Sequence, residues 1–242
     1  AKGEVRAMKI GVPKEIKTLE FRVGLVPPVV HQLIAYGHQV FVESGAGLGI
    51  GQSDEDYRKA GAKVLPDADA VFDAADMIVK VKEPQAVEIA RLKPHHVLFT
   101  YLHLAPDPEQ TKGLMKAGAT CIAYETITDA KGRLPLLAPM SQVAGRMATQ
   151  VGANLLLKPA GGRGMLIGGV PGVKPAKVVI LGGGVSGTHA AEMAVGMRAD
   201  VTLFDISPSR LEELDVQFGG KLKTVFSTPH AMAEAVADAD LV

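Results

Sequence analysis

The sequence is poor in cysteine and contains no long apolar run. Its 242 residues include one cysteine, Cys121, so an internal disulfide is excluded. A lone cysteine in the apolar segment TCIAY is typical of a core side chain in a protein of the reducing cytoplasm. No segment approaches the roughly 18 consecutive apolar residues of a membrane-spanning helix. We therefore expect a cytoplasmic protein that makes no membrane contact.

The sequence also lacks an excess of charge of either sign. Lys plus Arg number 26 and Asp plus Glu number 26, so there is no basic field to attract nucleic acid and no polybasic cluster for a membrane surface. Cys/His metal spacing, a GxSxG nucleophile elbow and a P-loop are all absent. We expect no metal site, and chemistry on small molecules.

What is present is an alternating pattern that predicts two α/β domains. A chain of 242 residues exceeds the usual size of one domain. Short β-branched runs alternate with amphipathic stretches, which is typical of parallel sheets with helices on both faces. We predict two doubly wound domains, over residues 8–138 and 139–242. Residues 1–7 lack the apolar core of a signal peptide, and we interpret Met8 as the native start and the residues before it as an expression remnant.

Strands and helices of the first domain can be placed by pattern. The predicted strands cover residues 9–13, 39–43, 77–81, 97–104 and 120–125, and the predicted helices cover residues 29–38, 54–62, 86–92 and 108–118. Pro27 and Pro28 stand where a helix begins, and Gly37, Gly61 and Gly118 stand where helices end. The positions of these prolines and glycines therefore agree with the helices that the periodicity predicts.

A long amphipathic stretch over residues 141–158 follows the segment RLPLLAP. We predict a helix that connects the two domains, with Ser141 as its N-cap and the domain boundary near Pro139. The next segment, residues 161–173, is rich in glycine around a short MLI run, which predicts a hairpin or an ordered loop.

The most informative motif is a glycine turn within residues 177–205. Gly182, Gly184 and Gly187 fit the G-x-G-x-x-G spacing, in which the glycines allow a tight turn, close approach of a pyrophosphate and contact between helix and strand. Asp205 ends the second strand about 20 residues further on, where a carboxylate binds the ribose hydroxyls of NAD. A glycine-rich turn without a ligand, or a methyltransferase-like fold, is the alternative. The strands, helix and acid in place favour a Rossmann NAD-binding domain.

The last residues, Asp240, Leu241 and Val242, have the pattern of the opening of a further strand. The second domain then holds about half of the two-part strand order of a Rossmann sheet. We therefore expect a C-terminally truncated chain with an incomplete cofactor domain. We expect the chain to contain the adenosine and pyrophosphate side of the cofactor site and to lack most of the nicotinamide side.

Two lysines interrupt a predicted strand of the first domain. Lys80 and Lys82 alternate with valines in MIVKVKEP and would project to one face of the strand. Burying an ammonium group without a partner is expensive. Lys82, nearer the carboxyl end, is our candidate for binding a substrate carboxylate or polarising a carbonyl, because ligands of open α/β sheets bind beyond those ends. The alternative is an edge strand with solvated lysines.

Two further side chains are candidates for chemistry. His103 ends the predicted strand VLFTYLHL, and imidazole can move protons in both directions near neutral pH. A structural histidine is the alternative, and the same holds for His95 and His96 in a polar turn. Arg22 in LEFRVGLVP can form a bidentate contact to a carboxylate, or it can be a surface arginine paired with Glu20.

Taken in chain order, these segments resemble bacterial alanine dehydrogenases. The segments that carry the resemblance are EIKTLEFRV, VKVKEP, LFTYLHLA, AYETI, PLLAPMSQVAGR, GGRGMLIGGVPGV and VVILGGGVSG, and the match runs from Met8 to the last residue. The alpha subunit of proton-translocating transhydrogenase and, more distantly, saccharopine-type lysine dehydrogenases are similar in architecture. YLHLA and KVKEP resemble the alanine dehydrogenase versions.

The resemblance implies an oxidoreductase of amino-acid metabolism that uses NAD. The implied reaction is the reversible oxidative deamination of L-alanine by NAD and water to pyruvate, ammonium and NADH, which serves L-alanine catabolism. Carried over by motif, Arg22 and Lys82 hold the substrate carboxylate and carbonyl oxygen in the first, substrate-binding domain. By the same resemblance His103 is the proton donor and acceptor.

The resemblance also implies a set of cofactor-binding residues. They are Ser141, Gly182, Gly184, Val185, Ser186 and Gly187 around the phosphates, Asp205 at the adenosine ribose, Arg210 near the adenosine, and Ser227 on the adenine side. The cofactor implied is NAD, and the assembly implied is a homo-oligomer, commonly a hexamer with contacts from the long helix.

Two other functions fit the same residues. A transhydrogenase-like domain would pass hydride to a partner protein, and a basic docking surface or following membrane spans would favour it. A non-catalytic NAD-binding fragment would bind NADH without turnover. Family members carry a catalytic acid in the second half of the Rossmann domain, which these 242 residues lack, so we expect impaired activity from this chain alone.

Overall fold

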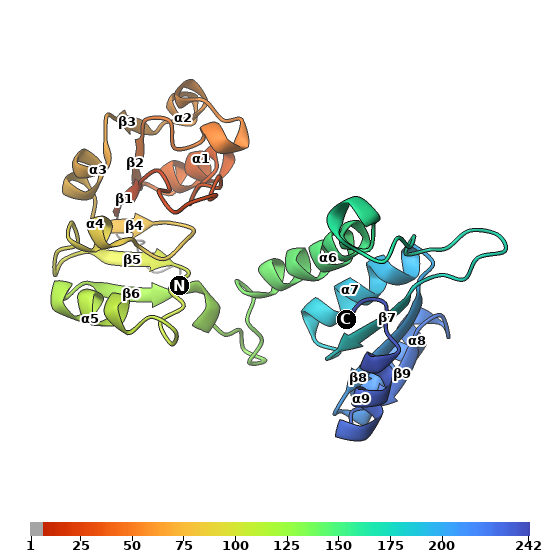
Figure 1. The fold of residues 1–242 in the computed structure, drawn as a ribbon. Coiled ribbons are helices and arrows are strands. Elements are labelled where there is room, and N and C mark those ends of the chain that lie inside the picture. The colour runs from red at the N-terminus through yellow and green to blue at the C-terminus, as the bar shows by residue number, and fades with distance from the viewer. Residues whose placement is uncertain (1–6) are drawn as a thin grey trace. The chain divides into compact units, whose positions relative to one another are not determined.

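A computed structural model describes residues 7–242 of the chain. These residues form two compact units that divide between Leu134 and Pro135 (Figure 1). The interpretation of residues 1–7 as a remnant falls, except for Ala7, outside the described residues. The predicted α/β class with two parallel sheets is confirmed. Within the described range, no helix has the length and apolar character needed to cross a membrane.

The sheet of unit 1 is parallel throughout. Its strands, in spatial order, are β3 (Lys63–Leu65), β2 (Gln39–Glu43), β1 (Lys9–Val12), β4 (Met77–Val79), β5 (Val97–Thr100) and β6 (Thr120–Ala123). The strand order reverses between β1 and β4, which are neighbours in the sheet. This is the topological switch point at which open α/β sheets bind ligands, beyond the carboxyl ends of the strands.

Helices follow the strands of unit 1 in the predicted alternation. They are α1 (Pro27–Ala35), α2 (Asp54–Lys59), α3 (Ala68–Ala74), α4 (Ala86–Ile89) and α5 (Pro108–Ala117), with short 3₁₀ turns η1 (Leu48–Ile50) and η2 (Tyr124–Thr126). Two predicted helix ends are confirmed: α1 begins at Pro27, and Gly118 caps α5 at a φ of 71° that favours glycine. Helices α1, α2 and α4 end three residues earlier than predicted, at Ala35, Lys59 and Ile89.

One strand and one helix of unit 1 have no counterpart in the predictions. β3 is a three-residue edge strand, too short for its alternation to stand out. α3 spans seven residues and is capped by the side chain of Asp67, which accepts the amide hydrogen of Ala70. Both elements are held by packing against β2 and β1 more than by a strong local pattern.

The core of unit 1 lies on both faces of the sheet. Adjacent residues of β4 point to opposite faces, so Ile78 packs with Leu98 and Phe72 while Val79 packs with Val12 and other residues of a second cluster. Covering both faces explains why these parallel strands are almost entirely apolar. Polar groups are thereby left to the ends of the strands. Cys121, predicted to be a core residue, is partly buried against the first of these clusters.

Unit 2 is a smaller parallel sheet with helices. Its strands are β7 (Lys177–Leu181), β8 (Asp200–Asp205) and β9 (Lys223–Phe226), in that spatial order, and its helices are α6 (Ala138–Leu155), α7 (Val185–Gly196), α8 (Pro208–Phe218) and α9 (Pro229–Ala237), with a 3₁₀ turn η3 (Lys158–Ala160). Leu241 forms a parallel bridge to Val178 on the other side of β7 from β8. The residues predicted to open a further strand form this one bridge.

Helix α6 starts earlier than predicted. Its N-cap is Leu137, Pro139 occupies its first turn, and no side chain caps it, so the prediction of Ser141 as the N-cap is wrong. Proline presets the backbone angle of a first helical turn, and this fixes the start of the helix before the serine. After η3 the glycine-rich segment is an ordered loop with one antiparallel bridge, between Val170 and Val173.

Helix α6 packs closely on α7 within unit 2. A Cβ on Gly145 would lie 2.1 Å from the carbonyl oxygen of Ser186, so only glycine permits this approach. The hydroxyl of Thr149 donates to the carbonyl oxygen of Ala190 at 2.9 Å one turn further along. The face of α6 that carries Gly145 and Thr149 therefore belongs to the core of unit 2.

Candidate functional site

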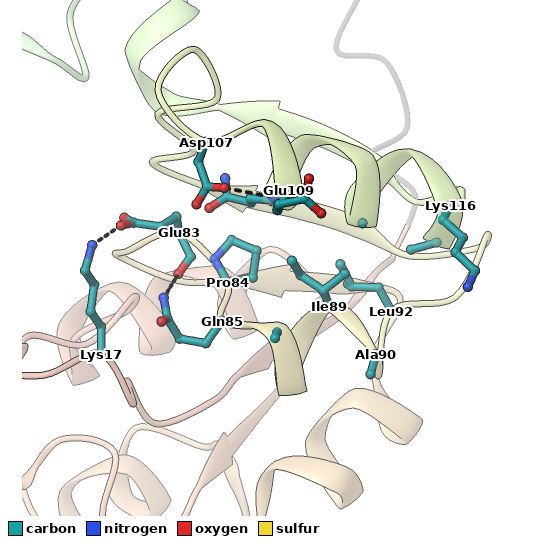
Figure 2. A pocket seen from close by; sticks show the side chains of 14 residues that line it. Lys17, Glu83, Pro84, Gln85, Ile89, Ala90, Leu92, Asp107, Glu109 and Lys116 are labelled. Atoms are coloured by element: carbon teal, nitrogen blue, oxygen red, sulfur yellow. Dashed lines mark hydrogen bonds and ion pairs between the residues drawn. The ribbon is translucent and has the colours of Figure 1, made fainter.

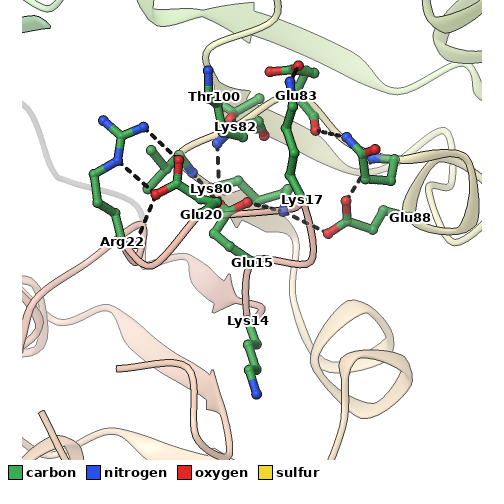
Figure 3. Close-up of polar contacts among 12 residues, drawn as sticks. Lys14, Glu15, Lys17, Glu20, Arg22, Lys80, Lys82, Glu83, Glu88 and Thr100 are labelled. Carbon is green, nitrogen blue, oxygen red and sulfur yellow. Dashed lines mark hydrogen bonds and ion pairs between the residues drawn. The ribbon is translucent and has the colours of Figure 1, made fainter. Parts of the chain in front are cut away.

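Three predicted site residues follow three neighbouring strands of unit 1. Arg22 lies in the loop after β1, Lys82 in the turn after β4, and His103 after β5. Because β1, β4 and β5 are adjacent and parallel, their carboxyl ends meet at one edge of the sheet, beside the switch point. Figure 3 shows Arg22 and Lys82 together at this edge.

Lys80 is fully buried, in contrast to Lys82, and is held by two carboxylates. Its Nζ lies 3.0 Å from Glu15 and 2.7 Å from Glu88, and all three side chains are at most 2 % exposed (Figure 3). β4 ends at Val79, so neither lysine lies on the strand itself. The alternative of an edge strand with solvated lysines is wrong, because β4 lies between β1 and β5.

The backbone that carries Lys82 is fixed from several directions. Oε1 of Glu15 accepts the amide hydrogen of Val81 at 2.6 Å. The carbonyl oxygen of Lys82 accepts the hydroxyl of Thr100 at 2.9 Å, and that of Lys80 accepts the hydroxyl of Tyr124 at 2.9 Å. A charged side chain mounted on such a backbone is preorganised, which is what substrate binding requires.

Arg22 forms a side-on ion pair with Glu20. Nε and Nη2 of the guanidinium donate to the two carboxylate oxygens at 2.8 and 2.7 Å. An ion pair between Arg22 and Glu20 was one of the two alternatives that the sequence left open. Glu20 is not the surface partner that this alternative assumed, because its side chain is only 7 % exposed. The hydrogen bond from Arg22 lowers the pKa of Glu20 to about 2, so the carboxylate stays ionised.

His103 sits in an unusual backbone conformation. Its φ is +48°, in the left-handed region that non-glycine residues rarely adopt. Its amide donates to Oε1 of Glu125 at 2.7 Å, and its ring lies parallel to that of Tyr101, with centroids 6.1 Å apart. The imidazole is exposed at the sheet edge.

Glu125 supports the backbone before and at His103. Burial acts to raise the pKa of this carboxyl, and the backbone amides of His103 and Leu102 outweigh it, so the pKa lies below its ordinary value. A carboxylate that accepts backbone amides fixes a loop by charge-assisted hydrogen bonds.

The sequence predictions missed Glu15 and Glu125 at this edge and described Glu20 only as a surface partner of Arg22. Glu15, Glu20 and Glu125 each follow a strand of the sheet and each contacts a loop that carries a predicted site residue. Their signal was a single acidic residue in a loop that follows a β-strand, close to a candidate cation. Spacing alone could not identify their partners, because Glu15 contacts Lys80 across 65 residues of sequence.

The glycine turn of unit 2 has the geometry that its spacing predicts. Gly182 has a φ of +102°, and Gly184 is the N-cap of α7. A Cβ on Gly187 would lie 1.8 Å from the carbonyl oxygen of Gly182, so helix and turn touch through glycine. A Cβ on Gly182 or Gly184 would meet nothing within 4 Å, and the helix N-terminus is thus open to a phosphate.

Asp205 ends β8 and turns its carboxylate toward the glycine turn. One oxygen accepts the amide of Ser207 at 2.8 Å and the other the amide of Gly183 at 2.7 Å, and both bonds lower the pKa of Asp205. Arg210, a residue of α8, contacts the same glycine turn. Its Nε donates to the carbonyl oxygen of Gly183 at 2.8 Å, and its Nη2 donates to the hydroxyl of Thr188 at 2.9 Å.

The remaining predicted cofactor residues surround the start of α7 or the end of β9. Val185 and Ser186 are the first residues of α7, and the hydroxyl of Ser186 donates to the carbonyl oxygen of Ser141 at 2.9 Å. Ser227 follows β9, and its amide donates to the carbonyl oxygen of Asp205 at 2.9 Å. The set lies at the carboxyl ends of the strands of unit 2, as a dinucleotide site requires.

A separate groove of about 770 Å³ runs between α4 and α5 of unit 1 (Figure 2). Its floor includes Pro84, Ile89 and Leu92, and Lys17 and Lys116 lie at its two ends. None of the predicted substrate-binding residues lines it. Within residues 7–242, no cluster of three or more His, Cys, Asp or Glu side chains is placed to hold a metal ion.

Comparison with known families agrees with this geometry. The family model "Alanine dehydrogenase/PNT, N-terminal domain" matches residues 11–144, and the model "Alanine dehydrogenase/PNT, C-terminal domain" matches residues 148–242. The chain belongs to the alanine dehydrogenase/PNT family. The resemblance inferred from the sequence motifs is thereby confirmed.

Individual members of the alanine dehydrogenase/PNT family are close to this chain. Alanine dehydrogenase of Halomonas elongata is 56 % identical over 235 residues, which cover 97 % of this chain and 63 % of that protein. A solved structure of an L-alanine dehydrogenase superposes with a TM-score of 0.91 at 53 % identity, over 97 % of this chain and 65 % of that one. The transhydrogenase of Sinorhizobium meliloti gives a TM-score of 0.78 at 28 % identity, over 96 % and 68 %.

Proposed function

We propose that the whole protein catalyses the NAD-dependent, reversible oxidative deamination of L-alanine. In balanced form, L-alanine, NAD⁺ and water give pyruvate, ammonium, NADH and a proton. The observation that supports this proposal most is the position of Arg22, Lys82 and His103 in loops that follow three adjacent strands at the switch-point edge of unit 1, in a chain 56 % identical to an alanine dehydrogenase. The chain spans 63 % of the length of that relative, so the activity is proposed for the whole protein.

Arg22 and Lys82 provide the charge for binding a 2-oxo acid or an amino acid. The guanidinium of Arg22 binds the substrate carboxylate, and Lys82 binds the carboxylate and the carbonyl oxygen. Two cations on separate, fixed loops define the orientation of the substrate Cα, which is catalysis by positioning. Lys82 also stabilises negative charge on the oxygen of the carbinolamine that forms when water adds to the iminium carbon.

His103 moves protons at the same carbon centre. In the direction of deamination its imidazole takes a proton from the attacking water and later passes one to the departing nitrogen. The reverse direction uses the same transfers in the opposite order. Its exposed ring on a strained, anchored loop suits a group that must reach both substrate and solvent.

The glycine turn and Asp205 of unit 2 suit the binding of NAD. The open helix N-terminus beyond Gly182 and Gly184 accommodates the pyrophosphate, and the ionised Asp205 at the end of β8 accepts ribose hydroxyls and repels the extra phosphate of NADP. A bound NAD would supply the hydride acceptor for the oxidation at the substrate Cα. Ser141, Ser186, Arg210 and Ser227 are proposed to line the phosphate and adenosine sides.

We also propose a homo-oligomer that forms through α6. The face of this helix opposite α7 carries Val143, Met147, Val151 and Leu155 at intervals of four residues, and each is about half exposed. An apolar stripe of this regularity is typical of a helix that packs against another chain. Sedimentation velocity gives the assembly state; a strictly monomeric chain at all concentrations would contradict this part.

The experiment for the catalytic proposal is NADH oxidation by the whole protein upon addition of pyruvate and ammonium. Loss of absorbance at the NADH band, dependent on both substrates and abolished in His103→Ala, is the expected result. Bacillus subtilis alanine dehydrogenase, 55 % identical to this chain, serves as the positive control for the assay. NADH binding without turnover would favour a non-catalytic NAD-binding module. Full activity in His103→Ala would remove His103 from the reaction.

A further inference from the structure

The contact between Glu20 and Arg22 is more elaborate than an ordinary ion pair. Oε1 of Glu20 accepts two hydrogen bonds from Arg22, from the backbone amide at 2.9 Å and from Nε at 2.8 Å. Oε2 accepts a third from Nη2 at 2.7 Å. The carboxylate therefore clasps one edge of the guanidinium and the main chain of the same residue. Such a clasp fixes both the side-chain rotamer and the tilt of the guanidinium plane.

A strained backbone conformation just before Glu20 places its carboxylate against Arg22. Leu19 has a φ of +63°, and it is one of only three non-glycine residues with positive φ among the described residues, together with His103 and Arg198. Its side chain is 82 % exposed, so no core packing accounts for the conformation. The turn, closed by the amide of Glu20 on the carbonyl oxygen of Lys17, folds the glutamate back over Arg22.

Other ion pairs of unit 1 show what an incidental contact looks like. Arg58 and Glu55 lie 3.7 Å apart on α2 with both side chains more than half exposed, a geometry that contributes little. Glu20 differs in being 7 % exposed and in making three hydrogen bonds to one partner. Figure 3 shows the pair beside Lys82, whose positive charge also acts on Glu20.

We propose that Glu20 is a positioning residue for substrate binding: it holds the guanidinium of Arg22 in the orientation that receives the substrate carboxylate. This inference rests on the proposed role of Arg22. A free arginine side chain loses rotamer freedom when a ligand immobilises it, and a pre-held one does not. Glu20 therefore increases the affinity for a 2-oxo acid although its own charge repels the carboxylate.

The two opposing effects can be separated by a matched pair of variants. Glu20→Gln and Glu20→Met remove the same charge and conserve most of the side-chain volume. The glutamine oxygen can still accept the two bonds that Oε1 makes, to the amide and Nε of Arg22, whereas methionine can accept neither. Any difference in substrate affinity between them then measures positioning without a change in net charge.

The measurement is a titration of pyruvate into each ¹⁵N-labelled protein, with the Arg22 Nε–H signal followed in the same spectra. We expect E20Q to bind pyruvate at least about fivefold more tightly than E20M, and the Nε–H signal to be sharp in E20Q and exchange-broadened in E20M. Glu55→Gln, which breaks the exposed pair on α2, is the control and should leave pyruvate affinity unchanged. Thermal unfolding checks that each variant folds, and E20A replaces E20M if the latter does not.

Equal pyruvate affinity in E20Q and E20M would overturn the positioning role while leaving Arg22 as a substrate residue. If the wild-type protein binds no pyruvate, or if Arg22→Lys binds it as well as the wild type, the proposed role of Arg22 fails, and the inference about Glu20 fails with it. The two failures are thus distinguishable in one data set.

Discussion

The ammonium group of Lys80 lies 2.7 Å from a carboxylate oxygen of Glu88, in an ion pair with side-chain exposures of 0 and 2 %. Glu15 completes the cluster at 3.0 Å. Glu15 also accepts the amide hydrogen of Val81 in the turn that carries Lys82, so a buried structural lysine and the lysine proposed to bind substrate are two residues apart in sequence. The difference between the two lysines is burial, because Lys80 is fully buried and Lys82 is not.

Removing the central cation of this cluster should destabilise unit 1. Lys80→Met would leave the carboxylates of Glu15 and Glu88 buried without a counter-ion, and we expect a loss of about 3–5 kcal/mol in the free energy of unfolding. Urea denaturation followed by circular dichroism measures it. Lys112→Met, which breaks an exposed pair with Glu109, is the control and should change stability by less than about 0.5 kcal/mol. A comparable small loss in both variants would contradict a structural role for Lys80.

Adding one methyl group to the glycine turn should disrupt unit 2. In Gly187→Ala the new Cβ would lie 1.8 Å from the carbonyl oxygen of Gly182, so turn and helix must separate. We expect a loss of about 2 kcal/mol or more in the free energy of unfolding, together with loss of NADH binding. The control is Gly196→Ala at the end of the same helix, where a Cβ meets nothing within 4 Å. It should be neutral or slightly stabilising; parallel losses in both would contradict the account.

Cofactor preference should depend on Asp205. Asp205→Ala removes the carboxylate that we propose repels the extra phosphate of NADP, and we expect the ratio of NADPH to NADH dissociation constants to fall by about tenfold or more. Fluorescence titration of the two reduced cofactors measures the ratio. Asp200→Asn, at the opposite end of β8 and paired with Lys223, should leave it unchanged. An unaltered ratio in Asp205→Ala would argue against the ribose role.

Acid should weaken the loop that carries Arg22. The folded-state pKa of Glu20 is lowered from 4.5 to about 2 by its hydrogen bond from Arg22. A carboxyl with a lowered folded-state pKa stabilises the protein fully above its unfolded pKa, and this stabilisation disappears as the pH falls through the folded value. The difference in unfolding free energy between wild type and Glu20→Gln should therefore be constant from about pH 5 to 7 and shrink between pH 4.5 and about 2. Urea titrations at each pH measure it, and a difference that persists unchanged near pH 2 would contradict the ion pair.

Much of this fold could be predicted because its signals are local. The glycine turn from Gly182 to Gly187 and the helix start at Pro27 each depend on the conformational limits of single residues. β3 and α3 escaped prediction because they are short and are stabilised by neighbours distant in sequence. Ser141 was misplaced as an N-cap because a proline two residues earlier had already set the helix start.

The cations of the candidate site could be named from the sequence, but most of their supporting carboxylates could not. Arg22 and Lys82 interrupt apolar surroundings, and this contrast is a local signal. Glu20 could be named only as a surface partner of Arg22, and Glu15 looks like an ordinary loop acid until the fold brings it against Lys80. Which of two neighbouring lysines is buried also depends on Glu88, a residue on the following helix.

The most direct test of the account is where pyruvate binds on unit 1. Titration of pyruvate into the ¹⁵N-labelled chain should shift the amide signals of the loops after β1, β4 and β5, centred on Arg22, Lys82 and His103, and Lys82→Met should abolish the shifts. Shifts confined instead to the groove between α4 and α5, or identical shifts in Lys82→Met and wild type, would contradict the assignment of the substrate site to the switch-point edge of the sheet.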